Sequence, residues 1–297
     1  MAGRVPSVQD VYARLNRGYF HLTEFERLVR GHANRDNYVL ASDEQYEGRT
    51  HRVHLRLLSR PSYWEWALAL GDGYHNLRSA MDHATYLAAQ LDDQWVMTPT
   101  TEKKLQFPIA DTPEKYTEAL SRTIGKLDPK FLDVVEKVQP FNRPASPGAV
   151  QPLSALRELN NRDKHRSLNF VALGLVDLTP HLKAGTTSVL VATDVRPARL
   201  SHEASTHVCT LTFDRPSPNI DVVCDLTATA LLDEPGYPPN VTALNRLIYD
   251  EVRLVVETLL GYLLPESASR LKELRNTSAQ PSAFYDTPPG PTAAAPL

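Results

Sequence analysis

The chain has 297 residues, enough for one large domain or two small ones, and its 42% hydrophobic and 23% charged content is ordinary for a globular protein. A formal net charge of −3 at pH 7 gives no global electrostatic support for nucleic-acid binding, which would need a local basic patch. No stretch approaches the roughly 18–20 apolar residues of a membrane span and no secretory signal is evident, which predicts a cytoplasmic protein without a membrane partner.

Helical and strand patterns alternate along the first third of the chain. Apolar residues recur at helical spacing over residues 7–33. Over residues 38–58 the period changes to two on either side of a Glu47-Gly48 turn, which predicts a β-hairpin. A long helix is expected over residues 62–91.

The middle of the chain combines a loop with further helices. Residues 95–113 form the predicted loop, and Pro108 favours an extended backbone just before it. The region 113–170 is expected to be mainly helical. Two short helices and a proline-rich connector precede a longer helix, which begins at Pro152 and runs to about Phe170.

Strands are predicted again between residues 188 and 230. Three segments there are rich in Val, Leu, Thr and Cys, and we expect them to form a three-stranded antiparallel unit: residues 188–193, 207–213 and 221–229. An amphipathic helix follows over residues 240–264, and residues 277–297 are predicted to be a disordered Pro/Ala tail. The sequence thus predicts a single α+β domain over residues 1–276, mainly α: a helical bundle with an inserted β-hairpin and the three-stranded unit.

The chain has two cysteines, Cys209 and Cys224, without the spacing of a metal site. So few cysteines predict no disulfide framework and indicate a reducing compartment. The two could still pair if they lie on adjacent strands.

The helix predicted over residues 62–91 has an unusual polar face. At 100° per residue, its apolar side chains separate from a set of polar ones: Asp72, His75, Asn76, Arg78, Ser79, Asp82 and His83. The face lacks the Lys and Glu that are typical of a solvated surface, and its groups suit fixed hydrogen bonds. Three interpretations remain open: a solvated face, a buried salt-bridge network between helices, or a functional site.

A second polar segment spans residues 157–166. One helical face there carries four polar side chains: Arg157, Asn161, Lys164 and His165. The cations could neutralise phosphates and His165 could titrate near pH 7, or the segment could be an exposed helix balanced by Glu158 and Asp163.

Contacts between the two polar segments would explain both at once. Asp163 or Asn160 could meet Arg78, or Asp82 could meet His165 or Arg166.

Residues 75–83 (HNLRSAMDH) resemble the HNLRSALDH signature of a large group of uncharacterised bacterial proteins that is common in actinobacteria. Residues 107–109 (FPI), 139–141 (QPF) and 161–166 (NRDKHR) match the other landmarks of that group in the same order. The resemblance covers roughly residues 10–175 and implies no established activity.

Arg78 and His83 are also similar to the R-x4-6-H motif of HEPN ribonucleases, which are helical-bundle proteins, often dimeric. This resemblance implies an RNA substrate, no metal or other cofactor, proton transfer by His83 and stabilisation of phosphate charge by Arg78. Supporting residues would come from both polar segments: His75, Asn76, Ser79, Asp82, Asn161, Asp163, Lys164, His165 and Arg166. HEPN motifs usually place Asn, Asp or His directly after the arginine, where this chain has Ser79, and HEPN domains are typically shorter.

Two other functions remain open. A metal could bind to His75, His165 and either Asp82 or His83, although the sequence lacks a His-x3-His or Glu-x-x-His pair. Alternatively, the polar residues are structural and the chain is a non-enzymatic interaction or regulatory protein, whose helix over residues 240–264 packs in its own core or on a partner. The sequence provides no evidence for DNA binding and contains no P-loop.

Overall fold

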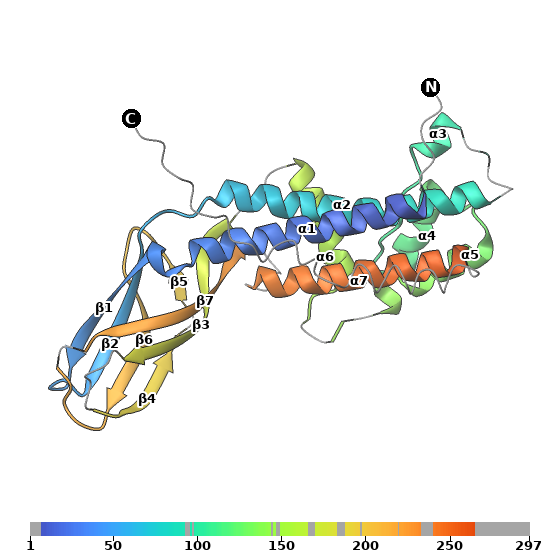
Figure 1. Ribbon diagram of the computed structural model, residues 1–297. Helices are drawn as coiled ribbons and strands as arrows, with labels where there is room; N and C mark the ends of the chain where they lie inside the picture. Colours follow the sequence, from blue (N-terminus) through green and yellow to red (C-terminus); the bar gives the residue numbers. More distant parts are fainter. Residues whose placement is uncertain are drawn as a thin grey trace, which may run out of the picture.

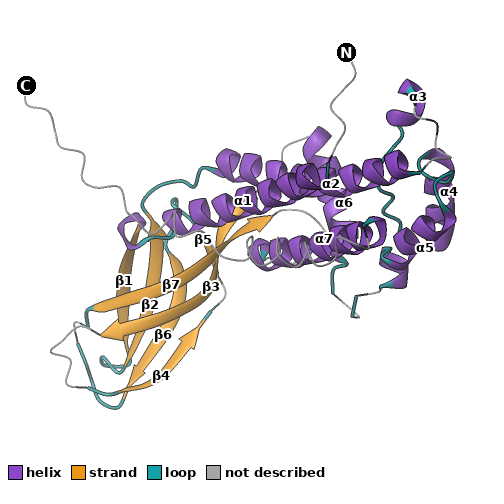
Figure 2. Cartoon of the chain, turned by 45° about the vertical axis from the view of Figure 1, so that its right-hand side comes forward, coloured by secondary structure: helices purple, strands orange, loops and turns teal. Residues whose placement is uncertain are grey.

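The computed structural model describes most of the chain: residues 7–92, 96, 98–143, 145–146, 149–165, 170–182, 188–196, 198–218, 220–232 and 240–264. The molecule is elongated, with a helical body at one end and two antiparallel sheets at the other (Figures 1 and 2). The fold is α+β and mainly helical, as the sequence predicts.

The helical body contains three long helices that lie side by side along its length (Figure 1). Shorter helices cover one side and the far end. The helices are α1 Val8–His32, α2 Tyr63–Leu91, α3 Pro99–Glu102, α4 Pro113–Arg122, α5 Pro129–Lys137, α6 Pro152–His165 and α7 Val241–Leu263, with short 3-10 turns η1 Arg35–Asn37 and η2 Pro140–Asn142. Among the described residues, none of these helices is both long and apolar enough to cross a membrane.

The strands form a four-stranded sheet in the order β1-β2-β6-β4 and a three-stranded sheet in the order β5-β3-β7. Their bounds are β1 Tyr38–Gln45, β2 Thr50–Leu57, β3 Phe170–Leu182, β4 Leu190–Val195, β5 Ala198–Leu200, β6 Thr206–Phe213 and β7 Val222–Leu232. The predicted hairpin is confirmed as β1 and β2. Its turn has three consecutive residues with positive φ, the last of them Gly48 at 80°.

Two predictions about the strands are wrong. The helix expected to reach Phe170 ends at His165, and the segment that follows is β3, which pairs with β7 along its whole length. The three segments expected to form one unit are divided between the sheets: β4 and β6 join the hairpin, and β7 pairs with β3. Both errors involve β3, which is rich in Leu, a residue compatible with a helix, and which is a strand because of its long-range pairing with β5 and β7. The predicted tail, residues 277–297, lies outside the described residues.

Glycine allows α1 and α2 to pack closely. A Cβ atom on Gly73 of α2 would lie 2.7 Å from Leu22 Cδ2 of α1, and one on Gly18 of α1 would lie 2.7 Å from Leu77 Cδ2 of α2. Neither contact leaves room for a larger residue. The apolar face of α7 is buried against the same bundle, so the amphipathic pattern of this helix is explained by packing in its own core.

Candidate functional site

Arg78 and Asp82, one turn apart on α2, hold the backbone of Phe107. Arg78 Nη2 donates to the Phe107 carbonyl oxygen, and the Phe107 amide donates to Asp82 Oδ1 over 2.8 Å. Arg78 Nη2 also lies 3.2 Å from Asp82 Oδ1, with the two side chains only 15% and 28% exposed. The pair therefore satisfies both backbone hydrogen-bonding groups of Phe107, as a neighbouring strand would.

Gln139 holds the same segment from the other side and is completely buried. Its Nε2 atom donates to the carbonyl oxygens of Pro108 and Val135, each over 3.0 Å. Its Oε1 atom accepts the Ala110 amide over 2.9 Å. The side chain thus connects the extended segment to the C-terminal end of α5.

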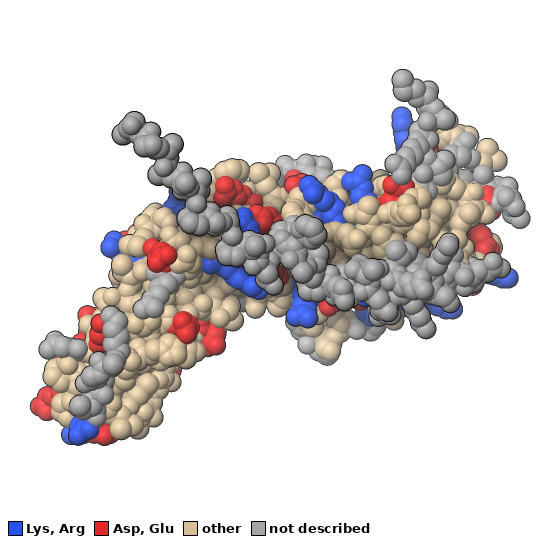
Figure 3. Space-filling view, in the orientation of Figure 1, with Lys and Arg blue, Asp and Glu red and all other residues tan. Residues whose placement is uncertain are grey.

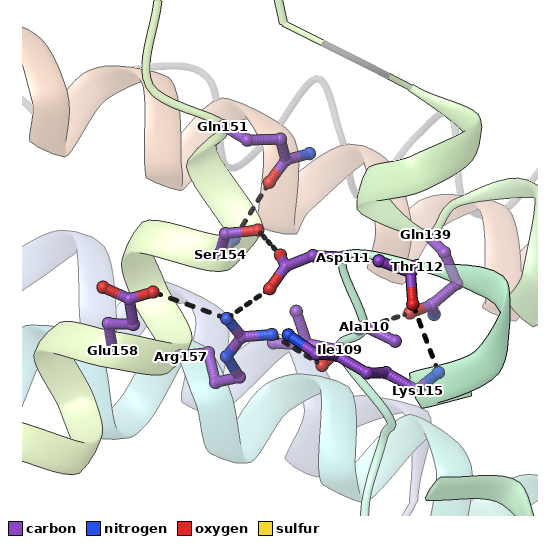
Figure 4. Close-up of polar contacts among 10 residues, drawn as sticks. All are labelled: Ile109, Ala110, Asp111, Thr112, Lys115, Gln139, Gln151, Ser154, Arg157 and Glu158. Carbon is purple, nitrogen blue, oxygen red and sulfur yellow. Dashed lines mark hydrogen bonds and ion pairs between the residues drawn. The ribbon is translucent and has the colours of Figure 1, made fainter. Parts of the chain in front are cut away.

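Two residues of α6 complete this arrangement (Figure 4). Arg157 Nη1 donates to the Ile109 carbonyl oxygen over 3.1 Å, and its Nη2 atom lies 2.7 Å from Asp111 Oδ2. Ser154 Oγ donates to the other oxygen of Asp111. The Ser154 amide in turn donates to Gln151 Oε1 over 2.9 Å, which caps the start of α6.

We call this arrangement the 107–111 clamp, because residues 107–111 are held by Arg78, Asp82, Gln139, Ser154 and Arg157. It connects residues 107–109 and Gln139, which the sequence singled out, to the polar face of α2 by hydrogen bonds. The sequence identified Gln139 only as a landmark, and Asp111 and Ser154 were missed. The signal that could have identified these residues is Pro108. It marks an extended segment, and the backbone groups of such a segment need hydrogen-bond partners.

The two polar segments do meet, but not at Arg78 as expected. A Cβ atom on Gly71 of α2 would overlap Asp163 Oδ2, so the carboxyl group of Asp163 packs directly on Gly71. Burial raises the pKa of Asp163, and the nearby charge of Asp72 raises it further, while His75 acts in the opposite direction. The contact forms here because Gly71 lets α6 approach, whereas Arg78 reaches Phe107 instead.

Helix α1 lies along the other flank of the polar face. Arg14 Nη1 donates to Asn76 Oδ1 over 3.4 Å, and Asn76 Nδ2 donates to the Asp72 carbonyl oxygen over 2.8 Å. Burial and the charge of Arg17 lower the pKa of His21, and Asp72 opposes this effect. These α1 residues were not singled out by the sequence, because only the packing of α1 on α2 places them here.

His83 is turned back onto its own helix. Its Nδ1 atom lies 2.8 Å from the Ser79 carbonyl oxygen and 3.3 Å from Ser79 Oγ. His83 is five positions after Arg78 in the helix, which corresponds to about 140° around the helix axis. The two side chains therefore diverge: Arg78 contacts the 107–111 segment, whereas the half-buried ring of His83 bonds Ser79.

The remaining candidates lie on α6. Asn161 is exposed. The side chains of Lys164 and His165, and all of Arg166, lie outside the described residues, and so do the contacts expected between Asp82 and His165 or Arg166. Among the side chains that are described, no group of three or more His, Cys, Asp or Glu could hold a metal ion. Acidic and basic side chains are interspersed on the face shown in Figure 3, so no extended basic surface is visible there.

The pH dependence of folding tests the Asp111 part of the clamp. Burial raises the pKa of Asp111, but hydrogen bonds from Ser154 and Arg157 and the charges of Arg157 and Lys115 outweigh burial and lower it overall. A lowered pKa contributes stability that is present above the unfolded-state pKa of about 4 and lost as pH falls through the folded-state value. We therefore expect Asp111→Asn to be less stable than the wild type near neutral pH, with the difference shrinking below about pH 4.

Urea unfolding of both proteins across this pH range measures that difference. A gap of constant size from neutral to acidic pH would show that the ionisation of Asp111 does not stabilise the fold.

Comparison with family models, curated proteins and solved structures finds no match to this chain.

Proposed function

We propose that this protein is a metal-independent endoribonuclease in which His83 is the general base. The supporting observation is the 2.8 Å hydrogen bond between His83 Nδ1 and the Ser79 carbonyl oxygen. A carbonyl oxygen only accepts, so Nδ1 carries the proton and the neutral ring has its lone pair on Nε2. This tautomer suits removal of a proton from a substrate hydroxyl group.

In the proposed reaction, His83 Nε2 takes the proton of a ribose 2′-hydroxyl group. The 2′-oxygen attacks the adjacent phosphorus and the bond to the 5′-oxygen breaks, with the leaving oxygen protonated by solvent. The products are a 2′,3′-cyclic phosphate and a 5′-hydroxyl end. Arg14, which bonds to Asn76 on the same side of α2, supplies positive charge for the phosphate.

This assignment differs from the role that the HEPN resemblance implies for Arg78. The guanidinium group of Arg78 is engaged by Phe107 and Asp82, and its side chain is only 15% exposed. A cation in that position stabilises the fold and is poorly available to a substrate. The proposal therefore keeps His83 as the proton-transfer residue and moves phosphate binding to Arg14.

Cleavage of a fluorescently labelled single-stranded RNA in the presence of a chelator tests the proposal. We expect His83→Ala to lower the rate at least about 100-fold, because the general base is lost. His32→Ala is the matched control. The His32 ring also bonds a backbone carbonyl oxygen, that of Ser59 at 3.2 Å, but it lies at the C-terminal end of α1, so full activity is expected.

Absence of cleavage by the wild-type protein, or full activity of His83→Ala, would contradict the proposal. A second function would then be favoured by the 107–111 clamp, in which the landmark residues Arg78, Gln139 and Arg157 are used inside the fold. That function is a non-enzymatic interaction or regulatory protein, whose polar residues are a structural network.

A further inference from the structure

The N-terminal half of α1 carries two exposed arginines, Arg14 and Arg17, that form no ion pair with another described residue. Arg14 Nη1 donates to the amide oxygen of Asn76, and Arg17 Cζ lies 5.3 Å from the centre of the Phe20 ring. In the C-terminal half of the same helix, by contrast, both arginines form ion pairs with glutamates of the preceding turn. Two exposed cations without a carboxylate partner are suited to bind phosphate groups.

Phe20 presents an aromatic ring to solvent beside these cations. The residue is 43% exposed, although its side chain is large and apolar. The guanidinium group of Arg17 lies over the ring, and the ring of His21 packs against it edge to face, with the two centroids 5.5 Å apart. Glu24, on the next turn, is paired with Arg27, so its negative charge is offset. An exposed aromatic ring next to a guanidinium group is a surface on which an unpaired base stacks.

This surface lies on the path that leads to His83. Arg14 bonds to the residue seven positions before His83, which shares the face of α2 on which His83 lies. Helices α1 and α2 lie side by side (Figure 1), and Leu22 of α1 packs on Gly73 of α2. Because Gly73 is ten positions before His83, Phe20 lies within about 15 Å of His83 along the helix axis. A few nucleotides of an extended strand span such a distance.

On the basis of the ribonuclease function proposed above, we propose that Arg17 and Phe20 bind a single-stranded RNA substrate, with one unpaired base stacked on the Phe20 ring and a phosphate group at Arg17. In a duplex each base is paired and stacked between its neighbours, so none can reach the ring. The substrate class is therefore single-stranded RNA. Stacking tolerates any base, so this contact sets the strandedness of the substrate and not its sequence.

Binding is measured separately from cleavage. The probe is a fluorescein-labelled 2′-O-methyl RNA of about twelve nucleotides, which lacks the attacking hydroxyl group, used alone and annealed to its complement. Fluorescence anisotropy with the full-length chain gives the affinity for each form at several salt concentrations. We expect the wild type to bind the single strand at least about 5-fold more tightly than the duplex.

Two variants test the two contacts. Phe20→Ala should weaken single-strand binding about 5- to 30-fold and leave duplex binding unchanged, whereas Phe20→Trp should retain it, because an indole also stacks on a base. Arg17→Ala should weaken binding and reduce the dependence of log K on log salt by about 0.7, the value for one lost phosphate contact.

The matched controls remove an aromatic ring and a cation that lie elsewhere. Trp64→Ala removes an aromatic side chain of α2 that is 65% exposed, and Arg27→Ala removes a cation of α1 that is paired with Glu24. Neither should change the affinity for the single strand.

Equal affinity of the wild type for the two RNA forms would overturn the proposal, and so would a Phe20→Ala protein that binds the single strand as tightly as the Trp64→Ala control. The comparison of the two RNA forms decides the matter even if a variant at Phe20 fails to fold. Cleavage of unmodified RNA is a separate measurement. Preferential single-strand binding without cleavage would contradict the ribonuclease function and leave this binding site in place.

Discussion

Replacing Gln139 with alanine is expected to lower the free energy of unfolding by about 3–5 kcal/mol. The side chain has no exposed surface and makes three hydrogen bonds to backbone groups. Its loss leaves the carbonyl oxygens of Pro108 and Val135 and the amide of Ala110 without this partner, at about 1–3 kcal/mol for each buried group. Urea unfolding, followed by circular dichroism, measures the change.

Two variants sharpen this test. Gln106→Ala removes an exposed glutamine from the same part of the chain and should change stability by no more than about 0.5 kcal/mol. Gln139→Glu keeps an acceptor for the Ala110 amide, but a carboxylate cannot donate to Pro108 or Val135, so it should also destabilise strongly. A loss below about 1 kcal/mol for Gln139→Ala would show that the segment does not depend on this residue.

Arg78→Ala is expected to lower the free energy of unfolding by about 2–4 kcal/mol. The change removes the donor to the Phe107 carbonyl oxygen and leaves the partly buried carboxylate of Asp82 without its cation. Arg78→Lys should recover only part of this loss, because an ammonium group lacks the planar geometry of a guanidinium group. Urea unfolding, followed by circular dichroism, measures both changes.

Arg27→Ala is the matched control for this ion pair. Arg27 bonds Glu24 through two nitrogens at 2.6 and 2.7 Å, a close contact between residues of one helix, but its side chain is 67% exposed. Exposed pairs contribute little, so we expect a change of at most about 0.5–1 kcal/mol. Equal effects of the two alanine variants would mean that Arg78 does not hold the segment.

The stability of Arg78→Ala also separates the two catalytic assignments. If Arg78 is structural, loss of RNA cleavage in this variant should accompany loss of stability, whereas His83→Ala should lose cleavage and remain folded. An Arg78→Ala protein as stable as the wild type but without activity would instead support the phosphate-binding role that the HEPN resemblance implies.

The sequence alone was sufficient for the elements whose signals are local. The helical period and the N-cap at Ser7 define α1, and the turn at Gly48 defines the hairpin. The unusual composition of the α2 polar face also indicated fixed hydrogen bonds correctly, although it could not identify their partners.

Only the tertiary structure decided which groups those side chains meet. The partner of Arg78 is a backbone carbonyl oxygen at Phe107, and a backbone group has no side chain to mark it in the sequence. The same holds for the partners of Gln139 and for β3, whose residues pair with residues of β7 that lie 40 to 62 positions later in the chain. Local periodicity fixes the elements of this protein, whereas contacts between distant segments fix the pairing of its strands and the placement of Arg78, Gln139 and His83.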